Sequence, residues 1–149
     1  MADATTTILS ATRSALEAAL TAGRRATAAG KTIDDHQVHA ERLAYAATEV
    51  RAADALAAYA ADRRAAGAPD AVVETMAEAF AAEVADRLRS RIDGHRDDFD
   101  VPDAVLGKGL GSADVQAAIR AAHHESRFRD IGREVLRTRG ANHAYVDGE

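Results

Sequence analysis

The stretch from residue 35 to residue 66 reads DHQVHAERLAYAATEVRAADALAAYAADRRAA, and it decides the fold. It contains neither Gly nor Pro, the two residues that most often interrupt a helix. Residues suited to a helix interface recur in it at alternating steps of four and three: His39, Leu43, Ala46, Val50, Ala53, Ala57 and Ala60. This spacing predicts one buried stripe on a helix about 48 Å long. The stripe is rich in Ala, so it buries little area per residue but lets a neighbouring helix approach closely.

The rest of the chain predicts further helices of the same kind. The expected long segments are 6–29, 34–66, 70–94 and 112–139, and a short extra helix is expected near 103–110. The expected N-caps are Asp34, Asp70 and Ser112, the expected C-cap is Gly140, and the polar stretch 95–100 is expected to be a loop. No segment alternates with period two, so no sheet is expected. The fold predicted is an all-α, four-helix up-and-down bundle over residues 1–140, followed by an irregular tail over 141–149.

The amino-acid composition excludes several classes of function. The 149 residues contain 19 Lys and Arg against 24 Asp and Glu, for a formal net charge of −5, and no Cys. The absence of Cys excludes disulfides, thiolate metal sites and cysteine nucleophiles. The acidic balance argues against nucleic-acid binding, and the sequence shows no membrane-spanning or secretory segment. We therefore expect a cytoplasmic protein.

Three groups of residues are candidates for a chemical role. His36 and His39 have the spacing of a metal pair on one helix face, but a helix-start pair with structural hydrogen bonds is the simpler interpretation. The adjacent His123 and His124 point about 100° apart on a helix, and His124 falls on the apolar ladder of its segment. The run 107–112, GKGLGS, lacks the order of a phosphate-binding loop and favours a flexible connection. We predict no catalytic, cofactor-binding or metal-ligating residue in this chain.

The densest basic run lies near the C-terminus and comprises Arg127, Arg129, Arg133, Arg137 and Arg139. Asp130 and Glu134 stand within it at spacings that allow ion pairs along a helix. Two interpretations stay open. The run is either a solvated helix face or an Arg-rich surface that contacts a partner or an anionic ligand.

Four stretches together resemble a known family: 31–49, KTIDDHQVHAERLAYAATE; 79–85, AFAAEVA; 126–133, SRFRDIGR; and 138–143, TRGANH. They resemble the helical N-terminal extension of methylsuccinyl-CoA dehydrogenase-like bacterial acyl-CoA dehydrogenases. In that family the extension precedes a dehydrogenase body that holds FAD and a carboxylate base. Family members continue into this body near Asp147 to Glu149, so the resemblance implies either an excised domain or the product of a split gene.

The resemblance implies a non-catalytic helical domain or subunit that packs on an acyl-CoA dehydrogenase body, in cis or in trans. FAD is expected in that body and no cofactor is expected in this chain, which alone is not expected to be an enzyme. The residues expected to dock are Tyr45, Tyr59 and Phe128, with Arg127 and Arg129 at the rim. Two alternatives stay open: a self-associating helical module that forms a homodimer, and a small metal or ligand enzyme built in the bundle core.

Overall fold

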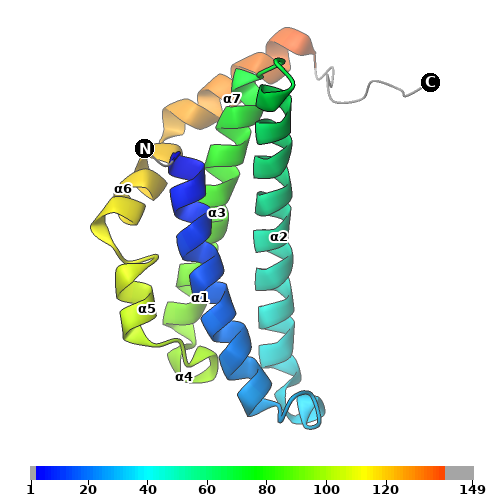
Figure 1. Cartoon of the computed structure of the whole chain (residues 1–149), viewed down its shortest axis with the longest axis vertical. Coiled ribbons are helices and arrows are strands. Elements are labelled where there is room, and N and C mark those ends of the chain that lie inside the picture. Colours follow the sequence, from blue (N-terminus) through cyan, green and yellow to red (C-terminus); the bar gives the residue numbers. More distant parts are fainter. Residues whose placement is uncertain (1–2, 140–149) are drawn as a thin grey trace, which may run out of the picture.

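The computed structural model describes residues 3–139, and these residues form an all-α bundle without strands, which confirms the predicted fold class. Three long helices are its frame: α1 (Ala4–Ala26), α2 (Gln37–Ala65) and α3 (Ala71–Gly94). They lie side by side, up and down, as Figure 1 shows. A short 3₁₀ helix, η1 (Ile33–His36), leads into α2. Within residues 3–139, no helix combines the length and the apolar character needed to cross a bilayer.

The remainder of the bundle consists of short helices rather than of a fourth long helix. These are α4 (Arg96–Phe99), α5 (Asp103–Lys108) and α6 (Ala113–Ala122), of which α6 packs on α3 and α1. The last helix, α7 (Glu125–Thr138), packs on α3 at the end where α2 passes into α3 (Figure 1). The predicted short helix near 103–110 is therefore present as α5. The predicted tail 141–149 and the expected C-cap Gly140 lie outside the described residues.

The expected single helix 112–139 is broken between α6 and α7. His123 ends α6, and His124 has extended backbone angles of φ −66° and ψ 136°. The Nδ1 atom of His124 accepts a hydrogen bond from the backbone N–H of Ser126 at 3.3 Å, so His124 caps α7. The expectation that His124, on the apolar ladder of segment 112–139, lies at the boundary of the core is wrong, because this side chain is exposed.

The helix starts are only partly as predicted. The Asp70 carboxylate accepts hydrogen bonds from the N–H groups of Val72 and Val73 at 3.0 and 3.2 Å, which confirms this cap. The Ser112 hydroxyl oxygen accepts one from Val115 at 3.4 Å, as expected. Asp34 caps no α-helix, because it lies inside η1, and α2 starts after it.

The core consists of small side chains closed by a few large ones. Each of the three long helices contributes Ala side chains that are almost fully enclosed, for example Ala19, Ala53 and Ala81, each with 0% exposed. The predicted stripe of α2 is buried apart from Ala57, which is partly buried. Phe99 is 0% exposed, so the expectation that 95–100 is a polar loop is wrong: α4 carries the largest fully buried side chain of the described residues.

Candidate functional site

The apolar stripe of α7 is not the face by which this helix packs on α3. The side of α7 that is partly buried carries Arg127, Ile131, Glu134 and Thr138, at steps of four, three and four. Phe128, Val135 and Leu136 are 45%, 47% and 79% exposed, and no residue of α7 is fully buried. At about 100° per residue, the exposed group is rotated by roughly a quarter turn or more from the packed side. The helix therefore offers a second, uncovered apolar surface.

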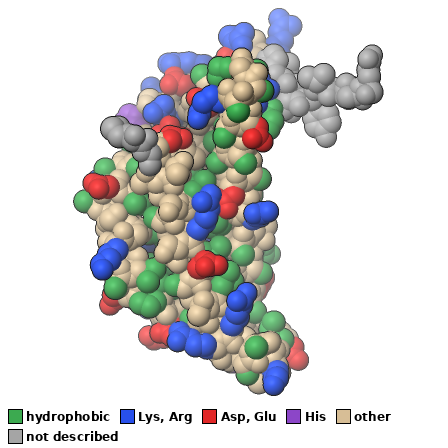
Figure 2. Space-filling view, in the orientation of Figure 1, with side chains coloured by type: hydrophobic (Ala, Val, Ile, Leu, Met, Phe, Trp, Pro, Cys, Tyr) green, Lys and Arg blue, Asp and Glu red, His purple; other side chains and the backbone are tan. Residues whose placement is uncertain are grey.

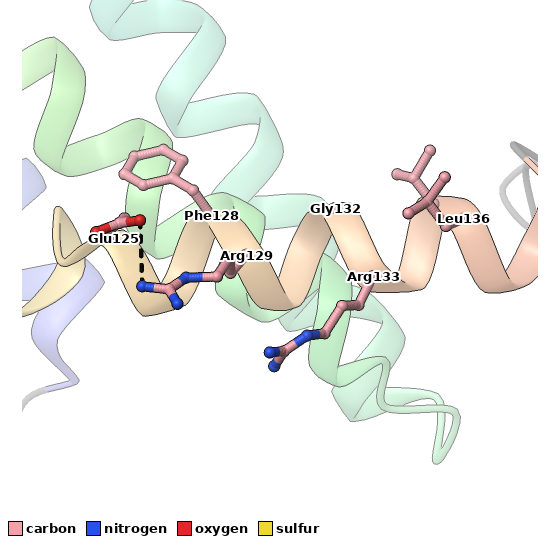
Figure 3. A pocket seen from close by; sticks show the side chains of 7 residues that line it. Glu125, Phe128, Arg129, Gly132, Arg133 and Leu136 are labelled. Atoms are coloured by element: carbon pink, nitrogen blue, oxygen red, sulfur yellow. Dashed lines mark ion pairs between the residues drawn. The ribbon is translucent and has the colours of Figure 1, made fainter.

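We define the α7 outer face as Phe128, Gly132, Val135 and Leu136. Figure 3 shows Phe128 and Leu136 rising from the same side of the helix, with Gly132 between them and Arg129 and Arg133 on the flank. Together with Glu125 these residues line a shallow, open hollow. The ring of Phe128 also lies 5.8 Å from that of His123, at the break between α6 and α7.

The arginines of this helix are held by carboxylates. Three of the pairs lie along α7 itself: Arg129 with Glu125 at 3.1 Å, Arg133 with Asp130 at 3.2 Å, and Arg137 with Glu134. The fourth, Arg127 with Glu78 at 3.6 Å, joins α7 to α3. The basic run is therefore neutralised in large part, and basic and acidic side chains are interspersed over the molecular face drawn in Figure 2.

The predicted docking residues fall into two separate groups. Phe128, Arg127 and Arg129 share α7, but Arg127 is turned toward Glu78 and only Phe128 and Arg129 line the hollow. Tyr45 and Tyr59 lie on α2, 14 residues apart, which is about 21 Å along the helix axis. The structure does not bring the α2 tyrosines and the α7 residues into one pocket.

The α2 tyrosines belong to a stripe of their own. We define the α2 outer stripe as Val38, Tyr45, Leu56 and Tyr59, whose spacing puts them within about 60° of one another. Val38 and Tyr45 are 61% and 59% exposed, and Leu56 and Tyr59 are partly buried. The Tyr59 ring lies under the guanidinium of Arg63, with 5.9 Å from the ring centroid to Cζ. The helical spacing of Tyr45, Leu56 and Tyr59 alone places these three residues beside the buried stripe of α2.

His39 is the one strongly buried imidazole of the described residues. Its side chain is 7% exposed, and neither ring nitrogen has a hydrogen-bond partner. Burial lowers the pKa of His39 from its usual value; Asp98 opposes the shift, and the positive charges of Arg42 and His36 add to it. The sequence favoured a structural His39 with hydrogen bonds, and its spacing alone could not show that both ring nitrogens lack a partner.

The other motifs offer little chemistry. His36 is only partly buried and precedes α2, and residues 3–139 contain no group of three or more His, Asp or Glu side chains placed to hold a metal ion. The glycine-rich run is a packed turn. Its Gly109 and Gly111 N–H groups donate to Val105 and Leu106 carbonyls at 3.0 and 2.6 Å, so they do not point toward a bound anion.

Comparison with known proteins adds the family. The family model described as "Acyl-CoA dehydrogenase, C-terminal domain" matches residues 4–91, more than half of the chain. The match begins with α1 and runs almost to the end of α3, so it covers the frame of the bundle. No curated protein and no solved structure matches the chain significantly. By the match over its three long helices, this chain belongs to the acyl-CoA dehydrogenase family, in the part that forms that family's C-terminal domain.

Proposed function

We propose that this chain is a non-catalytic helical domain that packs on the FAD-containing body of an acyl-CoA dehydrogenase. One observation carries the proposal: the family match coincides with the three-helix frame, α1 to α3. The core of that frame is made of alanines and aliphatic side chains, which suits a packing module. In this proposal the body holds the flavin and supplies the base.

The finer proposal is that this helical unit, which matches the model of the family's C-terminal domain, serves as the N-terminal helical extension of a methylsuccinyl-CoA dehydrogenase-like protein. It is supported by the stretches 31–49, 79–85, 126–133 and 138–143, of which the run IDDHQVHAER over 33–42 is the most distinctive. That run spans η1 and the start of α2. Within this run His39 is buried and contributes to the fold, whereas Val38 beside it is exposed and free to contact a partner.

The α2 outer stripe is the surface proposed to face the body. Exposed aromatic side chains on a rigid helix are typical anchors of protein interfaces. Tyr45 is 59% exposed, and Tyr59 is held by Arg63, whose Nη1 donates to the Tyr59 hydroxyl at 3.4 Å. From Val38 to Tyr59 the stripe extends about 31 Å, long enough to lie along one helix of a partner.

The proposal is tested by mixing the purified chain with a purified, FAD-containing acyl-CoA dehydrogenase from the same organism. The chain is expected to migrate with the flavin absorbance in size-exclusion chromatography. Tyr45→Ala and Tyr59→Ala are each expected to weaken the association by about tenfold, the effect of losing one interface anchor.

Ile33→Ala is the matched control, because Ile33 is also exposed, at 47%, but lies in η1 outside the stripe. The proposal is wrong if the chain and the dehydrogenase migrate separately at every concentration. It is also wrong if the purified chain binds flavin or oxidises an acyl-CoA thioester alone.

A further inference from the structure

The α7 outer face holds an unusual share of the uncovered apolar surface. Seven large apolar side chains of the described residues are exposed, and three of them, Phe128, Val135 and Leu136, lie on this one helix of 14 residues. The helix lies outside the stretch matched by the family model, which ends at residue 91. Contiguous apolar surface of this kind marks a contact site when it recurs along one side of a rigid element.

Gly132 stands at the centre of this face without a structural reason inside the chain. Its backbone is helical, and a Cβ atom placed on it would meet nothing within 4 Å. A glycine inside a helix costs about 1 kcal/mol relative to alanine. Its small size becomes useful when the backbone of another helix crosses directly over it.

The residues on either side of Gly132 are arranged for an identical helix running the other way. Phe128 precedes Gly132 by four residues and Leu136 follows it by four. Two antiparallel copies of α7 that cross at Gly132 about a twofold axis would therefore place Phe128 of each copy against Leu136 of the other. The apolar face is thus complementary to itself.

The charges at the ends of the face match in the same way. Glu125 precedes Gly132 by seven residues, and Arg139, the left-handed residue (φ 51°) that directly follows α7, comes seven residues after it. The same crossing would therefore bring Glu125 of each copy near Arg139 of the other. Glu125 has 79% of its side chain exposed. Arg127, Arg129, Arg133 and Arg137 each have a carboxylate partner, whereas within residues 3–139 none pairs with Arg139.

From this arrangement we infer that the α7 outer face joins two copies of the chain as an antiparallel, twofold-symmetric dimer that crosses at Gly132. An isologous contact of this type closes on itself and stops at two copies. A single pair of helices of this length buries less than the roughly 1,600 Å² of a standard interface, so the dimer is weak, with a Kd on the order of micromolar. The inference is independent of the proposed function, which uses α2.

The first test measures mass by sedimentation velocity or light scattering over a concentration series of the whole chain. A monomer–dimer equilibrium is expected, and Leu136→Asp is expected to weaken it by at least tenfold. Val38→Asp is the matched control, because Val38 is likewise exposed, at 61%, but lies on α2, and it is expected to leave the equilibrium unchanged.

The second test addresses the geometry. Glu125→Arg and Arg139→Glu are each expected to weaken the dimer, and the double variant is expected to restore it, because the pairing across the interface is re-formed with reversed signs. The chain has no Cys, so single cysteines report proximity cleanly. On oxidation, Gly132→Cys is expected to form a disulfide-linked dimer, whereas Gly107→Cys, which replaces another glycine with open space beside it, is not.

Three outcomes would overturn the inference. The first is a chain that stays monomeric throughout the concentration series. The second is a dimer that Val38→Asp dissociates and Leu136→Asp does not. The third is a double charge reversal that fails to restore association although the circular dichroism of the variants is unchanged. If Leu136→Asp instead weakens binding to the dehydrogenase and the chain alone is monomeric, the face belongs to the body and not to a second copy.

Discussion

The ring of His39 on α2 stands edge-on to the ring of Phe99 on α4, with 5.2 Å between the centroids and 87° between the planes. The ion pair of Arg42 with Asp98, at 3.1 Å, lies beside this contact and ties the same two helices together. A neutral imidazole can pack its edge against an aromatic ring. The two ring nitrogens of His39 have no hydrogen-bond partner to stabilise a positive charge. Burial without a hydrogen-bond partner lowers the pKa of His39, so this contact favours the neutral imidazole.

Stability is expected to depend on pH through His39. Its pKa is lowered in the folded state, so below the unfolded value of about 6.5 the unfolded chain binds more protons than the folded chain. Stability should be complete above that pH and should fall as pH decreases toward the folded pKa, by at most about 1.4 kcal/mol per pH unit. Urea unfolding between pH 5 and pH 8 measures this slope.

The controls for this slope are two single variants. His39→Leu is expected to remove most of the slope between the folded pKa and pH 6.5, and His123→Gln is expected to keep it, because His123 is only partly buried. An unchanged slope in His39→Leu would show that other groups cause the pH dependence.

Gly23 of α1 lies directly against Leu43 of α2. A Cβ atom at this position would lie 2.4 Å from Cδ1 of Leu43, which is itself only 7% exposed. Gly23→Ala is therefore expected to lower the free energy of unfolding by about 1–2 kcal/mol, although alanine is the better helix former. Thermal or chemical unfolding measures the change.

Gly107→Ala provides the comparison for Gly23→Ala. It lies in α5 with nothing within 4 Å of the added methyl group, so it should leave stability unchanged or raise it by less than about 1 kcal/mol. Equal effects of the two substitutions would mean that Leu43 simply rotates away from the added Cβ.

Asp70 and Asp34 were both expected to cap a helix, but in the structure only Asp70 does, so their substitutions should differ in their effect on stability. Asp70→Ala removes two backbone hydrogen bonds at the start of α3 and is expected to cost about 1 kcal/mol. Asp34→Ala is expected to change the free energy of unfolding very little, because within residues 3–139 its one polar contact is a hydrogen bond from the side-chain amide of Gln37 at 3.4 Å. A larger loss for Asp34→Ala would contradict the 3₁₀ start of α2.

Glu49 holds α2 to α3 by accepting a hydrogen bond from Nη2 of Arg91 at 3.0 Å. This hydrogen bond lowers the pKa of Glu49, burial opposes the shift, and the charges of Arg91 and Arg87 add to it. The stabilisation is therefore present at neutral pH and is lost as pH falls below the unfolded value of about 4.3 and through the folded pKa. Glu49→Gln is expected to lower the free energy of unfolding by about 1–3 kcal/mol at pH 7 and by less in acid.

Glu17→Gln is the control for Glu49→Gln, because Glu17 is exposed on α1. It should change stability by less than about 0.5 kcal/mol at either pH. If Glu49→Gln were no more harmful than Glu17→Gln, the ion pair would contribute nothing net to the packing of α2 on α3.

Sequence periodicity predicted the three long helices and the buried stripe of α2 correctly, but it predicted the buried side of α3 only in part. The helical spacing of Val73, Met76, Phe80, Val84 and Leu88 predicts the buried side of α3. Val84 and Leu88 are buried, yet Met76 is 39% exposed, while the smaller Ala77, Ala81 and Ala85 are buried. The reason is that the long helices approach closely over small side chains, which leaves larger ones at the margin. For the docking residues, the sequence indicated Phe128, but Val135 and Leu136 were not singled out as exposed.

What the sequence determined by itself is local. The alternating steps of four and three in α2 and the caps at Asp70 and Ser112 depend only on neighbours along one helix, so they could be predicted. Which face of a helix is covered depends on where the other helices lie, and only the tertiary structure decided that. In the tertiary structure Phe99 is buried in a segment expected to be polar, and the last helix is interrupted at His124. The packing of α7 also leaves Phe128 and Leu136 facing outward. A period identifies an apolar side, but the packing of α7 on α3 determines which side meets water.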